Sequence, residues 1–234
     1  MASVCVSLTF KALSALLIYP TEELVAAVPE IAAAIASDRV IGTPARRALD
    51  TLLVELGTHD LYELQERYVE LFDKTRKLSL HLFEHVHGES RDRGQAMVDL
   101  AMLYEKGGLL PTHNELPDYL PLFLEYLAMR PLDEARALLA DTSHILTALE
   151  ERLCKRDAPY AAIFTTLLSI AGVRRVVAET VAPEKEVDDF AALDAAWEET
   201  AVAFGPGDSM DGCSVERLHT QLRAAKRSAR TANT

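Results

Sequence analysis

Three side chains near the middle of the sequence have types and spacing suited to zinc chemistry. His81, Glu84 and His85 spell H-x-x-E-H, a pattern in which two histidines one helical turn apart hold zinc and the glutamate acts as the general base. His87 could add a nitrogen ligand, although His85 and His87 would lie about 200° apart on an ideal helix. Three fixed positions are weak evidence, and a histidine on a partly buried helix is more often a hydrogen-bonded structural residue. A zinc-dependent hydrolase that uses His81, Glu84 and His85 therefore stands as one hypothesis.

Nucleophilic catalysis has no comparable pattern in the sequence. There is no G-x-S-x-G elbow, and Cys5, Cys154 and Cys213 are widely spaced and form no C-x-x-C pair. Small apolar packing is the ordinary role of such cysteines. Their odd number and wide spacing argue against a disulfide scaffold and indicate a reducing, cytoplasmic environment.

The segment from Gly88 to Gly94 is dense in charge and glycine, although it separates two apolar stretches. In one interpretation it is the capped start of a helix, with Ser90 as the N-cap and with Arg91 and Arg93 paired with nearby acids. In the other it forms a polar wall beside a groove that binds a protein ligand. The residues alone leave both interpretations open.

The elements that position these residues are predicted to be helices. Apolar residues recur at helical spacing in three early stripes, which are Leu24, Val28, Ile31 and Ile35; Leu49, Leu52, Leu53 and Leu56; and Leu61, Leu64, Tyr68 and Leu71. Capping residues and prolines mark helix starts at Thr43 with Pro44, Asp60, Ser90, Pro117 with Asp118, Pro131 and Pro159. No run of residues alternates with the strand period, so the predicted fold class is all-α.

The helical pattern weakens toward the C-terminus. Residues 1–181 are predicted to form the helical domain, and residues 182–234 an acidic extension with a short helix near residues 190–203. The chain ends in a basic tail from Arg223 that is rich in Ala, Ser and Thr, a composition typical of disorder.

Charge and hydropathy limit the kinds of partner that we expect to bind and the compartment in which we expect the protein. Asp and Glu outnumber Lys and Arg by 36 to 24 in 234 residues, for a net charge of -12, which opposes binding to nucleic acid and favours a basic peptide. The apolar stretch from Val4 to Tyr19 contains Lys11 and lacks a cleavage signal. No uncharged run reaches the roughly 20 residues of a membrane span. We therefore expect neither an export signal nor a membrane span.

Four segments carry a resemblance to a known family. The longest is E-H-V-H-G-E-S-R-D-R-G-Q-A-M, from Glu84 to Met97. Three more agree in order and spacing, namely Y-V-E-L-F-D at 68–73, E-L-P-D-Y-L-P-L-F-L-E-Y-L at 115–127 and L-D-A-A-W-E-E at 193–199. From Leu8 to Phe204, the sequence resembles the nitrate reductase delta-subunit family, the NarJ-type assembly chaperones.

The resemblance implies a single-domain helical bundle like that of the TorD and DmsD chaperones, without enzymatic activity or a cofactor of its own. Such chaperones bind the N-terminal segment of the unfinished catalytic subunit of respiratory nitrate reductase. They keep it competent for insertion of the molybdenum cofactor and an iron-sulfur cluster, and they delay its membrane docking. Molybdenum cofactor biosynthesis proteins are candidate further partners, and membrane contact is expected only through the client complex. A structural adaptor that stays in the mature enzyme is a further hypothesis.

Helix-in-groove binding of a client segment requires an apolar trough with polar and acidic groups beside it. The predicted trough consists of Tyr68, Leu71, Phe72, Leu120, Phe123 and Leu124, and burial in the core is an equal alternative for each. The predicted polar contacts are Glu84, His85, Arg91, Arg93, Glu115, Asp118, Tyr119 and Glu125. Tyr119 stands where related chaperones often carry histidine.

Overall fold

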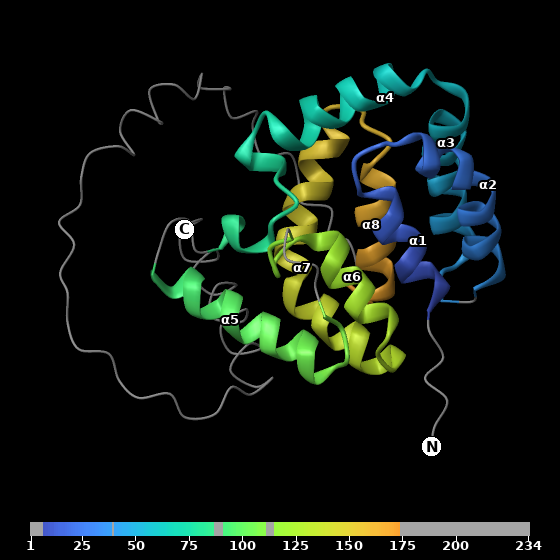
Figure 1. The fold of residues 1–234 in the computed structure, drawn as a ribbon. Helices are drawn as coiled ribbons and strands as arrows, with labels where there is room; N and C mark the ends of the chain where they lie inside the picture. Colours follow the sequence, from blue (N-terminus) through green and yellow to red (C-terminus); the bar gives the residue numbers. More distant parts are fainter. Residues whose placement is uncertain (1–6, 39, 87–90, 111–114, 174–234) are drawn as a thin grey trace, which may run out of the picture. The chain divides into compact units, whose positions relative to one another are not determined.

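The computed structural model describes residues 7–38, 40–86, 91–110 and 115–173, and all of them belong to one compact unit. Its principal elements are the helices α1 (Leu8–Leu16), α2 (Glu22–Ser37), α3 (Thr43–Thr58), α4 (Leu61–Tyr68), α5 (Arg91–Lys106), α6 (Leu120–Ala128), α7 (Leu132–Cys154) and α8 (Ala161–Ile170) (Figure 1). This confirms the all-α class. The predictions for residues 174–234, including the boundary at 181, the helix near 190–203 and the tail, lie outside the described residues, as do Cys5, His87 and Ser90.

The helix starts follow local capping chemistry. Thr21 caps α2 by accepting a hydrogen bond from the Leu24 N–H at 3.2 Å, and Asp60 caps α4 by accepting one from the Tyr62 N–H at 2.9 Å. α3 begins at Thr43 with a proline in its first turn. The predicted starts of α3 and α4 are therefore confirmed.

The apolar stripes bury themselves between neighbouring helices. α7 packs against α8, α1 against α6 and α2, and α3 against α2 and α8 (Figure 1). The first two predicted stripes are buried throughout, and in the third Leu61 alone is only half-buried. Helix periodicity therefore predicted the core faces of α2, α3 and α4.

The connection between α4 and α5 is irregular. A π-helical turn at Val69–Asp73 is followed by short 3-10 turns at Arg76–Leu78 and Leu82–His85. His81 lies outside these turns and forms an antiparallel bridge with Tyr119. In this bridge the Leu82 N–H donates to the Asp118 carbonyl at 2.9 Å, and the Leu120 N–H donates to the Leu80 carbonyl at 2.8 Å. The bridge places the His81 segment beside the start of α6.

This bridge corrects two expectations from the sequence. His81 and His85 do not lie one turn apart on an α-helix, as the zinc pattern requires, because His81 is extended. α6 begins at Leu120, after Tyr119, and its N-terminus has no side-chain cap, so Asp118 does not cap that helix. None of the helices in the described ranges combines the length and apolar character needed to cross a bilayer.

Gly107 follows α5 where the chain passes close to α6. A Cβ there would overlap the Tyr126 ring, with Arg130 Cζ and the Leu103 carbonyl oxygen each at 3.3 Å. We expect Gly107→Ala to lower the free energy of unfolding by about 1–3 kcal/mol in urea denaturation. Gly94 in α5 is the control, because nothing lies within 4 Å of a Cβ there. The free energy of unfolding of Gly94→Ala should rise by about 0.5–1 kcal/mol. Unchanged stability of Gly107→Ala would show that the Tyr126 ring moves aside without cost.

Candidate functional site

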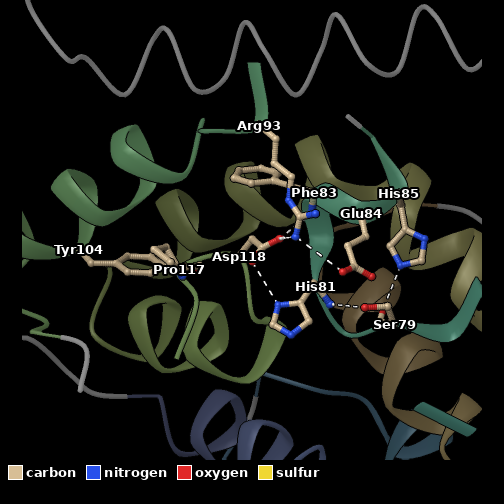
Figure 2. Close-up of polar contacts among 9 residues, drawn as sticks. All are labelled: Ser79, His81, Phe83, Glu84, His85, Arg93, Tyr104, Pro117 and Asp118. Atoms are coloured by element: carbon tan, nitrogen blue, oxygen red, sulfur yellow. Dashed lines mark hydrogen bonds and ion pairs between the residues drawn. The ribbon is translucent and has the colours of Figure 1, made fainter. Parts of the chain in front are cut away.

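The buried carboxylate of Asp118 joins the start of α6 to the His81 segment (Figure 2). The Asp118 side chain is 0% exposed. Its Oδ2 accepts a hydrogen bond from the Phe83 backbone N–H at 3.1 Å, and its Oδ1 lies 3.1 Å from His81 Nδ1. Since an ionised carboxylate can only accept, Nδ1 of His81 carries the hydrogen. Asp118 thus fixes both the backbone at Phe83 and the orientation of the His81 ring.

Arg93, in the first turn of α5, adds ion pairs to this cluster. Its Nη2 lies 3.6 Å from Glu84 Oε1 and 4.0 Å from Asp118 Oδ2, and the side chains of Arg93 and Glu84 are both 21% exposed (Figure 2). This arrangement agrees with the interpretation of a helix start whose arginine pairs with neighbouring acids. Arg91 begins α5, but its side chain lies outside the described residues.

The pKa values of the two histidines in the cluster, His81 and His85, are shifted in opposite directions. The hydrogen bond to Asp118 raises the pKa of His81, although burial opposes that shift. Burial lowers the pKa of His85, and the nearby Arg152 guanidinium acts in the same direction. His85 Nε2 donates to the Ser79 carbonyl at 2.8 Å, because a carbonyl oxygen can only accept. One nitrogen of each ring is therefore committed to the protein.

The zinc hydrolase hypothesis gains no support from this geometry. His81 pairs with Asp118, His85 binds a backbone carbonyl, and Glu84 faces Arg93 (Figure 2). In the part of the chain that the structure describes, no three His, Cys, Asp or Glu side chains are grouped so that they could hold a metal ion. His87, the suggested third ligand, lies outside that part.

The pKa shift of His81 predicts a pH-dependent contribution to stability. Because its folded pKa is raised, protonated His81 stabilises the fold below the unfolded pKa of about 6.5, and the contribution is lost as the pH rises through the folded pKa. We expect the stability difference between the wild type and His81→Asn to shrink between about pH 6 and about pH 8 in urea denaturation.

His85→Gln is the matched control for this measurement. The folded pKa of His85 is lowered, so its contribution is present above the unfolded pKa of about 6.5 and is lost on acidification through the folded pKa. The difference in the free energy of unfolding between the wild type and His85→Gln should therefore decrease as the pH falls through the folded pKa of His85. If the stability difference between the wild type and His81→Asn stayed constant from about pH 6 to about pH 8, that result would contradict the assigned pairing of His81 with Asp118.

The six residues predicted to form an apolar trough are all buried. Their exposed fractions are Tyr68 5%, Leu71 6%, Phe72 6%, Leu120 0%, Phe123 2% and Leu124 0%. The rings of Tyr68 and Phe72 lie 5.0 Å apart, and both pack against Tyr160. In this arrangement they are core residues, and client binding by them stays a prediction that requires neighbouring elements to move.

The predicted polar contacts differ in their exposure. Glu115 and Glu125 are exposed, Glu84, His85 and Tyr119 are half-buried, and Asp118 is buried. The Tyr119 ring packs 5.3 Å from the His81 ring, and its hydroxyl oxygen lies 3.5 Å from that of Tyr68. Tyr119 therefore lies between His81 of the Asp118 cluster and the buried ring of Tyr68. Contact of these polar residues with a client stays a prediction.

Two further tyrosines belong to this region and were not among the predicted binding residues. The Tyr104 hydroxyl donates to the Pro117 carbonyl at 2.8 Å and so holds the turn before Asp118 (Figure 2). Tyr19, 43% exposed, packs edge-on against Tyr68 with ring centroids 5.6 Å apart. No local signal in the sequence indicated either contact.

Comparison with known proteins decides the family. The family model described as nitrate reductase delta subunit matches residues 38–166, a range that contains all the predicted binding residues. The chain belongs to the nitrate reductase delta subunit family. The resemblance seen in the segments 68–73, 84–97 and 115–127 is thereby confirmed.

Named relatives of this delta subunit family member cover most of its length. The nitrate reductase molybdenum cofactor assembly chaperone NarJ of Escherichia coli (strain K12) is 47% identical over 203 residues, 84% of this chain and 86% of that protein. The probable chaperone NarW of the same strain is 47% identical over 70% of this chain and 71% of its own length. The probable chaperone NarJ of Bacillus subtilis (strain 168) is 38% identical over 73% of this chain and 93% of its own length. These names describe the assembly of an enzyme, in agreement with the expectation that this chain is not an enzyme.

Proposed function

We propose that this protein is an assembly chaperone for respiratory nitrate reductase. It binds the N-terminal segment of the catalytic subunit before the cofactors are inserted, and keeps that subunit competent to receive the molybdenum cofactor and an iron-sulfur cluster. It delays docking of the catalytic subunit at the membrane until loading is complete. The observation that carries the proposal is the 47% identity, along 84% of the chain, to a relative named as a molybdenum cofactor assembly chaperone.

The geometry around Asp118 supports a binding role for the same residues. Two segments that resemble the family, Glu84–Met97 and Glu115–Leu127, meet there through the contact of Arg93 with Asp118. Glu84 and Asp118 lie at this junction, and the whole chain carries a net charge of -12. A basic client segment would be attracted by this charge.

Exposed aromatic surface beside the junction suits an amphipathic client. Tyr19 is exposed and packs edge-on against Tyr68, and Tyr119 is half-buried with its hydroxyl oxygen 3.5 Å from that of Tyr68. Tyrosine offers apolar ring area together with a hydroxyl for hydrogen bonding, which is why it is frequent where proteins bind peptides. The cytoplasm is the proposed compartment, and molybdenum cofactor biosynthesis proteins are proposed as additional partners.

Titration calorimetry with the full chain tests client binding. The probe is a synthetic peptide with the N-terminal sequence of the nitrate reductase catalytic subunit from the same organism, and the control is a peptide of scrambled sequence. We expect saturable one-to-one binding of the first peptide that weakens as salt screens the acidic surface. Absence of binding from about pH 6 to about pH 8, across the titration range of histidine, would contradict the proposed function.

A further inference from the structure

Within the described ranges, the ring of His81 is held at one nitrogen and open at the other. Nδ1 faces the Asp118 carboxylate, which is 0% exposed, whereas the His81 side chain as a whole is 30% exposed. Part of the His81 side chain is therefore accessible. Among the described residues nothing forms a hydrogen bond with Nε2, and this atom is not one of the polar atoms that the fold buries without a partner.

The backbone that carries this ring is also held by hydrogen bonds. The bridge between His81 and Tyr119 pins the main chain on both sides of the histidine, and the His81 N–H donates to Ser79 Oγ at 3.2 Å. A side chain held in this way loses little conformational freedom when a ligand binds, so a hydrogen bond to it costs less entropy. An oriented imidazole with one free nitrogen is a common binding group in proteins.

The groups that face His81 determine which ligand atom fits Nε2. Nδ1 keeps its hydrogen because Asp118 can only accept, so the neutral ring presents Nε2 as an acceptor. The charged and titratable groups around the ring are Asp118, Glu84, Arg93 and Tyr119. A basic peptide brings further positive charge, which disfavours a second proton on His81 and favours the neutral, accepting ring. The matching ligand group is thus a donor, either a backbone N–H or a basic side chain.

We infer that His81 contacts the N-terminal segment of the client through Nε2, and that Asp118 is a positioning residue that holds the His81 ring for this contact. The inference rests on the proposed function and assigns the contact to a residue outside the set predicted from the sequence. Tyr119, packed against the His81 ring, and the exposed Tyr19 extend the same surface. In this inference Asp118, which is fully buried, acts through His81 and needs no contact of its own with the client.

His81→Asn tests the contact without removing the support. The asparagine amide can still donate to Asp118 from near the position of Nδ1, whereas no atom replaces Nε2. We expect calorimetry with the client N-terminal peptide to show affinity reduced about tenfold, the effect of losing one strong hydrogen bond. The wild-type affinity should rise as the pH increases through the pKa of His81, and the variant should lose that rise.

His59→Gln is the control, because His59 is an exposed histidine at the end of α3 and is not among the residues predicted to contact the client. We expect it to bind the peptide like the wild type, with the wild-type pH profile. Wild-type affinity and pH profile in His81→Asn, alongside saturable binding by the wild type, would overturn this inference and leave the proposed function intact. No binding by the wild-type chain itself would overturn both.

Discussion

Replacing Asp118 with alanine is expected to lower the free energy of unfolding by about 3 kcal/mol, the scale of breaking a buried charged interaction. The substitution leaves the Phe83 N–H and the His81 Nδ1–H without their acceptor and takes one carboxylate away from Arg93. Because the Phe83 donor is buried, water cannot restore its bond. Thermal unfolding measures the effect, and for a domain of this size the midpoint should fall by roughly 10 °C.

Asp118→Asn separates the loss of charge from the loss of the acceptor. Its amide oxygen can still accept from the Phe83 N–H, so we expect it to lose about half as much stability as the alanine variant. Glu125→Ala serves as the surface control, since Glu125 is exposed on α6, and it should change stability by less than about 0.5 kcal/mol. An Asp118→Ala variant that unfolds at the wild-type midpoint would refute the structural role of this carboxylate.

Phe123→Ala is expected to have an effect of similar or greater size, a loss of about 3–5 kcal/mol. The Phe123 side chain is 2% exposed in α6, the helix that packs against α1. Removing its ring would leave a cavity that the surrounding helices fill only in part. Urea denaturation at a temperature where the variant is still folded measures the loss.

The same variant tests whether Phe123 belongs only to the core or also lines a trough that binds the client. If Phe123 belongs only to the core, the folded variant should bind the client peptide with affinity close to that of the wild type. If Phe123 lines a trough that opens for the client, affinity should fall together with stability. Weakened binding by the folded Phe123→Ala variant would contradict a role in the core alone and support the assignment to the trough.

Helices were predictable because their signals are local. The stripe from Leu24 to Ile35 and the Asp60 cap each lie within a few turns of one helix, so the sequence contains all the information that forms them. The trough prediction used the same apolar periodicity, which identifies the buried face of a helix but does not separate the core from a binding groove. Phe123 and Leu124 therefore fitted both interpretations.

The cluster around Asp118 was less predictable because it depends on pairing across the chain. Local sequence indicates a proline and an aspartate before a helix, a familiar capping pattern. The bridge between His81 and Tyr119 instead buries Asp118 and turns it toward Phe83 and His81, 35 and 37 residues earlier in the sequence. No short-range pattern encodes such a contact, so Asp118 was predicted as a helix start and a polar contact with the client. His81 was predicted as a zinc ligand, with a hydrogen-bonded structural role as the alternative.

The molybdenum content of nitrate reductase tests the central claim most directly. The catalytic subunit is purified from cells with and without the gene for this protein, and molybdenum is measured per polypeptide. An assembly chaperone predicts that subunit made without it is largely free of molybdenum, that the intact gene restores loading, and that the mature enzyme does not retain the chaperone. Full molybdenum loading without the gene, or retention of this chain at fixed stoichiometry in the mature enzyme, would contradict the account.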